Sequence, residues 1–169
     1  DVAVTGVQTC ALPISNDAPV ATDSSKTTGE NAILSSSVPA ATDVDGTIAS
    51  YQLVNGLGAN NGALTFNTDG TYTFTPGTDF DSLAQGDSRD VTFTYQAVDN
   101  NGANSGTQTV TITVTGTNDA PVATDSSKTT GENAILSSSV PAATDVDGTI
   151  ASYQLVNGLG ANKIGRAHV

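Results

Sequence analysis

Oxygen-bearing side chains that could bind a cation gather at the turns of this chain. The pattern Asp-x-Asp-Gly stands at 43–46 and again at 145–148, and Asn-Asp stands at 16–17 and again at 118–119. Further acidic residues flank the predicted strands, namely Glu30, Asp79, Asp81, Asp87 and Asp99. Carboxylate and carbonyl oxygens on turns suit calcium, because this ion takes many oxygen ligands in irregular geometry.

Other metals suit the chain less well. Magnesium demands a stricter octahedron. Zinc favours histidine and cysteine, and the one histidine, His168, and the one cysteine, Cys10, both lie near the ends. Calcium is therefore the predicted cofactor. Each motif also has a purely structural interpretation: Asp-x-Asp-Gly can cap a turn, 99–102 can be a hairpin turn, and Glu30 with Asn31 can be a solvated pair.

Hydrophobic and polar residues alternate along several short stretches, as they do in strands with one buried face. The clearest are 91–97 and 109–115, then 64–66 and 72–74, with further strands expected near 25–28, 33–34 and 51–53. Seven strands predict an all-β fold, a Greek-key β-sandwich of immunoglobulin-like type. The predicted core comprises Ile33, Val38, Tyr51, Leu53, Leu64, Phe66, Tyr72, Phe74, Val91, Phe93, Tyr95, Val110, Ile112 and Val114.

A long internal repeat dominates the organisation of the chain. Residues 16–60 recur without a single change at 118–162. Similarity at a domain-sized period is typical of tandem arrays and indicates a structural or adhesive protein. We expect a complete repeat at 16–117, followed at 118–162 by a truncated second copy with only the first three strands. The missing partners should leave Ile135, Tyr153 and Leu155 uncovered and the strand edges open.

The two ends of the chain match neither copy. Residues 163–169 can be encoded by a string whose reverse complement, in a shifted frame, encodes the Cys-Ala-Leu-Pro-Ile stretch at 10–14. Both ends resemble one translated sequencing adapter. We therefore expect 1–15 and 163–169 to be non-native segments and exclude them from the fold.

The composition is strongly acidic, with a formal net charge of −12. Between 16 and 162 the basic residues are Lys26, Arg89 and Lys128. Such a surface repels nucleic acid and anionic membranes, because binding to phosphate groups needs lysine and arginine. No apolar run approaches the roughly 20 residues of a transmembrane helix. We expect no nucleic-acid partner and no direct membrane insertion.

The order of these motifs resembles that of bacterial cadherin-like and VCBS-type repeats of large secreted adhesins. The matching pieces run through the complete repeat: Asn-Asp-Ala-Pro at 16–19, Glu-Asn at 30–31, the segment 41–46, Val-Asp at 98–99, and the last strand leading into Asn-Asp-Ala-Pro at 118–121. The resemblance implies a cadherin-like sandwich, calcium between successive repeats, and an extracellular or cell-surface protein exported by a signal outside this segment. It also implies adhesion through a stiffened stalk, with neighbouring repeats as partners and a polysaccharide or cell-surface ligand as a further candidate.

The resemblance implies two sets of calcium ligands. The junction after the complete repeat would use Glu30, Asp81, Asp87, Asn118, Asp119, Asp145 and Asp147. The preceding junction would use Asn16, Asp17, Asp43, Asp45 and Asp99. The family's usual linker is one residue longer, and the spacing Leu-Asp-Arg-Glu is absent here. The choice among Asp79, Asp81 and Asp87 therefore stays open, and we expect one ion at each junction.

Two other classes of function are alternatives to the stalk. A polysaccharide-binding module, assisted by the same calcium, needs an exposed aromatic platform, and Phe80 is the aromatic residue that the alternation leaves free. A glycosidase needs two acids across a cleft, whereas the acids here stand in turns at the ends of a repeat. We expect that the protein is not an enzyme.

Overall fold

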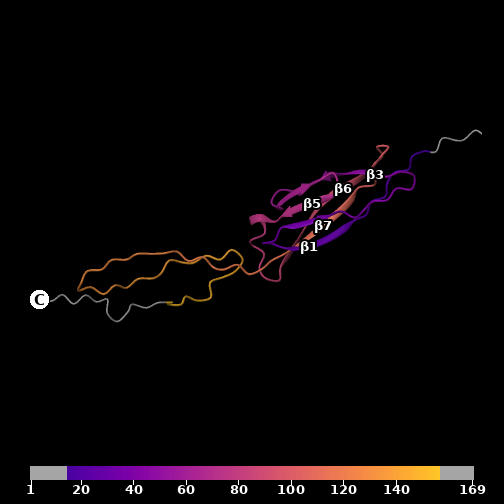
Figure 1. Ribbon diagram of the computed structural model, residues 1–169. Coiled ribbons are helices and arrows are strands. Elements are labelled where there is room, and N and C mark those ends of the chain that lie inside the picture. The colour runs from indigo at the N-terminus through magenta and orange to yellow at the C-terminus, as the bar shows by residue number, and fades with distance from the viewer. Residues whose placement is uncertain (1–14, 157–169) are drawn as a thin grey trace, which may run out of the picture. The chain divides into compact units, whose positions relative to one another are not determined.

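The computed structural model describes residues 15–156, which divide between Thr117 and Asn118 into two compact units (Figure 1). Unit 1 contains the complete repeat, and unit 2 contains the second copy. The terminal segments predicted to be non-native, 1–15 and 163–169, lie outside the described residues except for Ser15.

Unit 1 is a two-layered β-sandwich. Its strands are β1 (Ser24–Gly29), β2 (Leu34–Ser37), β3 (Ile48–Asn55), β4 (Ala63–Phe66), β5 (Thr71–Thr75), β6 (Ser88–Asp99) and β7 (Gln108–Thr115), with a 3-10 turn, η1, at Gly77–Asp79. One sheet has the order β1-β7-β6-β3 and the other has the order β2-β5-β4. β1 pairs with β7 in parallel, and the other pairs are antiparallel. The predicted all-β sandwich with seven strands is confirmed.

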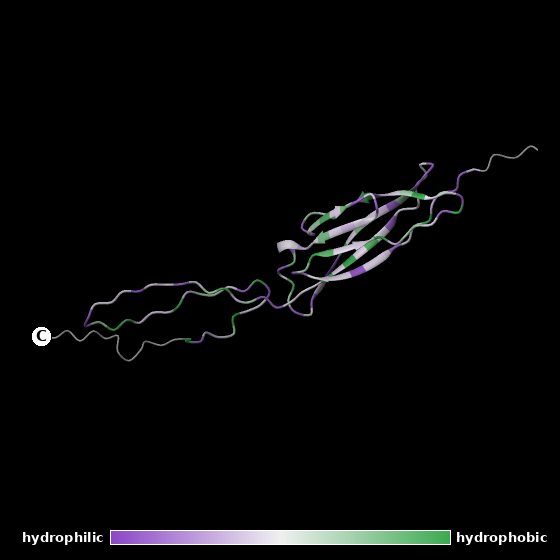
Figure 2. Cartoon of the chain, in the orientation of Figure 1, coloured by the Kyte–Doolittle hydropathy of each residue, from purple (hydrophilic) through white to green (hydrophobic). Residues whose placement is uncertain are grey.

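Alternation along β6 and β7 builds the centre of the core. Val91, Phe93, Tyr95 and Ala97 of β6 are buried, and the residues between them are half-buried or exposed. Figure 2 shows the same alternation of hydrophobic and hydrophilic positions along the strands. Phe93 meets Tyr72 of the opposite sheet edge-to-face, with ring centroids 5.0 Å apart. Such a pair favours one arrangement of the two rings. It also stabilises the fold by burying apolar area.

Two residues predicted for the core, Ile33 and Leu53, do not belong to it. The side chain of Ile33 is 67% exposed, because β2 begins one residue later and turns Leu34 toward the core instead. A shift of one residue exchanges the two faces of a strand. The side chain of Leu53 is 41% exposed. It lies on the edge strand β3, beside a shift in the register with β6.

The prediction that Phe80 is free was wrong. Its side chain is fully buried directly after η1, and its ring meets that of Phe74 edge-to-face at 6.1 Å. The Arg89 guanidinium lies 3.9 Å from the centroid of the Phe80 ring. A cation over an aromatic face is attracted by the ring quadrupole. Phe80 therefore closes the core at the end of the sandwich next to η1.

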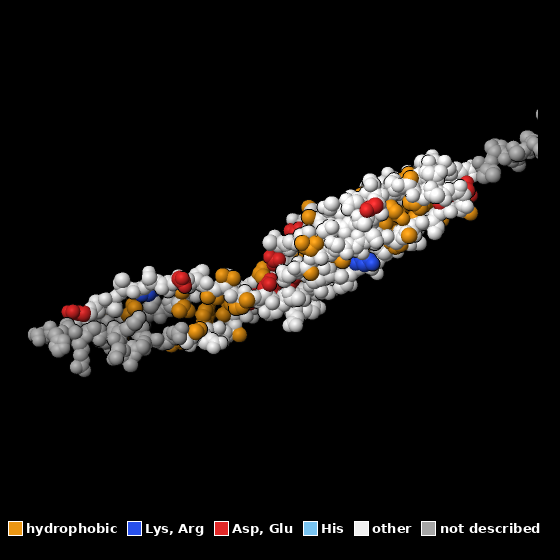
Figure 3. Space-filling model, in the orientation of Figure 1, with side chains coloured by type: hydrophobic (Ala, Val, Ile, Leu, Met, Phe, Trp, Pro, Cys, Tyr) orange, Lys and Arg blue, Asp and Glu red, His pale blue; other side chains and the backbone are white. Residues whose placement is uncertain are grey.

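Unit 2 contains the same sequence as the first part of unit 1 but forms no strand within residues 118–156. An isolated bridge joins Val122 to Thr144, as Val20 joins Thr42 in unit 1. Hydrophobic side chains lie on the surface of this unit (Figure 3), among them Ile135 at 97% exposed and Leu155 at 82% exposed. The contrast with unit 1 is clearest at Val140, which is 63% exposed, whereas its equivalent Val38 is 6% exposed in the core of unit 1.

Replacing Phe80 with alanine should lower the free energy of unfolding of unit 1 by about 3–5 kcal/mol, because a fully buried aromatic side chain is lost. The matched control is Ile33→Ala, at a mostly exposed position, which should change it by no more than about 0.5 kcal/mol. Urea unfolding followed by tyrosine fluorescence measures both. Equal effects for the two variants would contradict the placement of Phe80 in the core.

Candidate cation-binding sites

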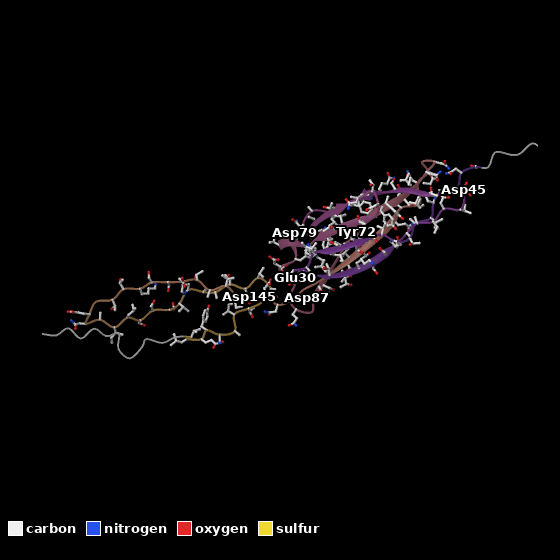
Figure 4. All side chains as sticks on the ribbon, in the orientation of Figure 1. Glu30, Asp45, Tyr72, Asp79, Asp87 and Asp145 are labelled. Atoms are coloured by element: carbon white, nitrogen blue, oxygen red, sulfur yellow. The ribbon has the colours of Figure 1, made fainter. Side chains whose placement is uncertain are left out.

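The candidate ligands of unit 1 divide between its two ends. Figure 4 shows Asp45 at one end and Glu30, Asp79 and Asp87 at the other, with Tyr72 between them. We call the end formed by Asn16, Asp17, Asp43, Asp45 and Asp99 the N-terminal pole. The end formed by Glu30, Asp79, Asp81, Asp87 and Thr117 is the C-terminal pole.

The Asp-x-Asp-Gly turn organises the N-terminal pole. Oδ1 of Asp43 accepts hydrogen bonds from the backbone N–H groups of Asp45 at 3.1 Å and Gly46 at 3.0 Å. The Asp45 carboxylate accepts from the backbone N–H of Asp17 at 3.2 and 3.3 Å. Oδ2 of Asp43 is buried and accepts no hydrogen bond from any described residue. This oxygen is therefore left for a ligand or for solvent.

Asp99 caps the turn between β6 and β7 and also holds the chain segment before β1. Its carboxylate is 2% exposed and accepts hydrogen bonds from the backbone N–H groups of Ala103 at 2.7 Å and Asn101 at 2.9 Å. Its second oxygen accepts from Nδ2 of Asn16 at 2.6 Å. These bonds, that from Asn16 first, hold the pKa of Asp99 below its ordinary value of 3.8, because they favour the ionised form.

Two amides at this pole were missed by the prediction. Oδ1 of Asn100 accepts a hydrogen bond from the backbone N–H of Thr47 at 2.7 Å, and Nδ2 of Asn101 donates to Oδ1 of Asn16. A side chain at Gly46 would lie 2.7 Å from Oδ1 of Asn100 and 3.1 Å from Oδ2 of Asp43. The sequence Asn-Asn-Gly after Asp99 predicts a hairpin turn. It does not show that this turn contacts the Asp-x-Asp-Gly turn.

Glu30 is the central acid of the C-terminal pole. It is 2% exposed, and its Oε1 accepts hydrogen bonds from the backbone N–H and the hydroxyl of Thr117, each at 2.7 Å. Its Oε2 is buried and accepts no hydrogen bond from the described residues. One oxygen of Glu30 thus holds Thr117, the last residue of unit 1, in place. The other oxygen has no protein donor.

The three acids before β6 have different surroundings. Asp81 is half-buried and lines a hollow of about 390 Å³ together with Glu30, Asn31 and Pro76. Oδ2 of Asp79 accepts a hydrogen bond from the backbone N–H of Gly62 at 2.9 Å, so this carboxylate closes a turn. Asp87 is exposed, and its backbone carbonyl accepts from Gly116. Of the three, Asp81 shares a hollow with Glu30.

Unit 2 repeats the local geometry of the N-terminal pole. The backbone N–H of Asp119 donates to Oδ2 of Asp147 at 3.1 Å, as Asp17 does to Asp45, and the backbone N–H of Asp147 lies 3.4 Å from Oδ1 of Asp145. Oδ1 of Asp147 is buried without a protein donor. Nδ2 of Asn118 donates to the backbone carbonyl of Asp119. This turn therefore forms without the surrounding sandwich, whereas Glu132, the equivalent of Glu30, is exposed.

The donor chemistry fits a hard cation, although no complete cage is formed. Within residues 15–156 no group of three or more acidic, histidine or cysteine side chains is arranged to hold a metal ion. Each pole nonetheless presents a buried carboxylate oxygen without a protein donor, on Asp43 or on Glu30. The side-chain atoms at both poles that could bind a cation are oxygens, which calcium prefers and which suit zinc poorly. Each pole therefore offers oxygen ligands of the kind a hard cation prefers, but not a complete set.

Comparison with known protein families matches residues 16–116 to the bacterial cadherin-like domain. The chain belongs to the bacterial cadherin-like domain family. This confirms the family that the order of motifs indicated. Domains of this family are typically not enzymes and occur in extracellular proteins, so unit 1 is a structural, adhesin-type repeat.

Other comparisons add little to the cadherin-like assignment. No curated protein matches the chain. One solved structure is similar: the 2,6-sialyltransferase of Vibrionaceae Photobacterium sp. JT-ISH-224, in a ternary complex with CMP and lactose. The identity is 14% and the TM-score 0.33, over 57% of this chain and 18% of that chain. A likeness at this level carries no argument about function. Among the described residues, no helix has the length and hydropathy needed to cross a membrane.

The stability of unit 1 should depend on the ionised form of Asp99. Because its folded-state pKa is lowered, its contribution is fully present above the ordinary value of 3.8 and is lost as the pH falls through the lower folded-state pKa. Urea unfolding in chelator at pH 6, 4, 3 and 2 should show a loss of stability below about pH 4. This loss should shrink in Asp99→Asn and persist in the exposed control Asp125→Asn. An unchanged pH profile in Asp99→Asn would contradict this role.

Proposed function

We propose that this chain is a calcium-binding structural repeat of an extracellular bacterial adhesin, in which calcium links successive repeats and stiffens a tandem stalk. The observation that carries the proposal is a buried carboxylate oxygen without a protein donor at each pole of a cadherin-like sandwich. A buried charged oxygen without a partner destabilises a fold. A bound cation would remove that cost.

The ligand sets support a site that two repeats complete together. Calcium takes six to eight oxygens, and neither pole alone supplies a cage among the described residues. On this proposal the C-terminal pole supplies Glu30 and Asp81, with Asp87 at its margin. The next repeat supplies its own N-terminal pole, here Asn118, Asp119, Asp145 and Asp147. The N-terminal pole of unit 1 serves the preceding repeat in the same way.

Charge explains why the ion would stiffen the junction. The chain has a net charge of −12, and acids stand at both ends of the complete repeat. Without a cation these carboxylates repel one another, and the junction between repeats acts as a hinge. With calcium the repulsion becomes mutual attraction to one ion. Affinity should be about 10⁻⁴–10⁻³ M, as in other extracellular calcium modules.

The polysaccharide-binding alternative loses its main support. It depends on an exposed aromatic platform, and Phe80, the side chain best suited to that role, is fully buried beneath Arg89. Unit 1 does not offer this platform at the predicted position. Adhesion to a polysaccharide or another cell-surface ligand therefore belongs to the whole adhesin, and this repeat contributes reach and stiffness.

Calcium should raise the thermal stability of a protein made of two complete repeats. With a dissociation constant in the range given, about 10 mM calcium adds about 1.4–2.7 kcal/mol to the free energy of unfolding. The variant D145N/D147N should lose most of this gain, because it removes two junction carboxylates. The control D69N/D90N makes the same change in charge at exposed positions outside both ligand sets, and should keep the gain.

Calorimetric melting in calcium and in chelator measures the effect. A gain that survives in D145N/D147N would assign calcium to other acids. If calcium does not raise the stability of the unmodified protein, the acids serve only to form turns and to keep the protein in solution.

A further inference from the structure

The last residues of unit 1 are bonded to both chain segments that carry the acids of the C-terminal pole. The backbone N–H of Glu30 donates to the carbonyl of Thr115 at 2.9 Å, and the backbone N–H of Gly116 donates to the carbonyl of Asp87 at 2.9 Å. Thr117 donates to the carboxylate of Glu30. This uncharged segment therefore connects the acid that follows β1 to the turn that ends in Asp87.

Gly116 is buried and leaves no room for a side chain. A Cβ atom at this position would lie 2.3 Å from the carbonyl oxygen of Leu83 and 2.5 Å from that of Ala84. Both distances are far shorter than a van der Waals contact. The backbone of Gly116 therefore packs directly on the segment between Asp81 and Asp87. Any larger residue would displace this segment together with the acids at its ends.

Thr117 holds the Glu30 side chain by one of its carboxylate oxygens. Its backbone N–H and its hydroxyl both donate to Oε1, each at 2.7 Å, and the hydroxyl oxygen accepts from Nδ2 of Asn31 at 3.3 Å. Glu30 is 2% exposed, and its Oε2 is buried without a donor among the described residues. Rotation of the carboxylate would break both bonds from Thr117. The free oxygen therefore has a fixed direction.

We propose that Gly116 and Thr117 are positioning residues for the cation site at the C-terminal pole. Thr117 orients the free oxygen of Glu30, and Gly116 fixes the segment that carries Asp81 and Asp87. This inference rests on the proposed function, because it takes Glu30 as a calcium ligand. Both residues act through the acids and not as ligands. A site whose ligands are held in place before the ion arrives loses less conformational entropy on binding.

The same contacts couple the ion to the end of the repeat. Glu30 offers Oε2 to a cation and holds Thr117 with Oε1. Coupling between two such contacts is reciprocal, so each should strengthen the other. Thr117 directly precedes Asn118, the first residue of the second copy. Calcium bound at Glu30 should therefore also fix the residue that leads into the next repeat, as a stiff stalk requires.

The variant E30Q identifies the relevant step in an isothermal titration of the full chain with calcium. It keeps an acceptor for Thr117 and replaces the free oxygen with an amide nitrogen, so the binding step at the C-terminal pole should disappear. If E30Q binds calcium like the unmodified protein, Glu30 is not a ligand. Both the proposed function at this pole and the positioning role would then be overturned.

The variant T117V removes the hydroxyl that orients Glu30. It keeps the size of the side chain, and residue 117 is exposed, so the core is unaffected. The step that E30Q removes should become about 10–100-fold weaker, as expected when a group that orients a metal ligand is lost. T117S keeps the hydroxyl and should bind like the unmodified protein. The matched control T113V removes a hydroxyl from a 2.6 Å hydrogen bond to Asp90, which belongs to neither ligand set, and should also bind normally.

The variant G116A should weaken the same step by at least about tenfold, because it displaces the segment that carries two of the acids. Its control is G106A, where a Cβ atom would meet only Nε2 of Gln108, at an ordinary 3.6 Å. Cooperative urea unfolding in chelator checks that each variant is folded before titration. If E30Q loses the step but T117V or G116A keeps its affinity, the positioning role of that residue alone is overturned. Equal losses in T117V and T113V, or in T117V and T117S, would also overturn the role of Thr117.

Discussion

The β6–β7 hairpin is the element on which the rest of the structure depends. β1 pairs onto β7 and β3 pairs onto β6, so both edges of the larger sheet are attached to it. Its inward side chains form the centre of the core, where Phe93 meets Tyr72 of the other sheet. Its turn carries Asp99 at the N-terminal pole, and its open end leads through Thr115 to Thr117, which binds Glu30 at the C-terminal pole. One hairpin thus fixes both the packing and the distance between the two acidic poles.

The poles contain an arrangement that lowers the stability of the fold. Leaving a buried carboxylate oxygen without a donor costs about 1–3 kcal/mol in a folded protein. Unit 1 carries such oxygens on Asp43 and Glu30, while the other oxygen of each carboxylate accepts backbone hydrogen bonds. Each acid is therefore held rigidly by one oxygen and left free at the other. A fold selected for stability alone would satisfy both, whereas a fold that receives a cation from outside benefits from this arrangement.

Most of the fold could be predicted from the sequence, because strand alternation is a local signal. Val91 to Ala97 shows which face is buried before any partner strand is known. Ile33 was misplaced because the start of β2 depends on pairing with β5 and not on hydropathy. Phe80 was missed because its burial depends on Arg89 and on the turn before it.

The site was predicted less fully, because the contact between Asn100 and the turn at Asp43 joins residues that are distant in sequence. The second copy shows the same difference: the hydrogen bond from Asp119 to Asp147 forms locally, whereas residues 118–156 form no strand.

The central claim, that calcium stiffens successive repeats, is tested most directly by the dimensions of two complete repeats in solution. Small-angle X-ray scattering would compare the particle in calcium and in chelator, at matched ionic strength. The account predicts a larger maximum dimension and a narrower range of conformations in calcium, and a flexible particle in chelator. It predicts that D145N/D147N behaves in calcium as the unmodified protein does in chelator. Identical scattering of the unmodified protein in the two solutions would contradict it.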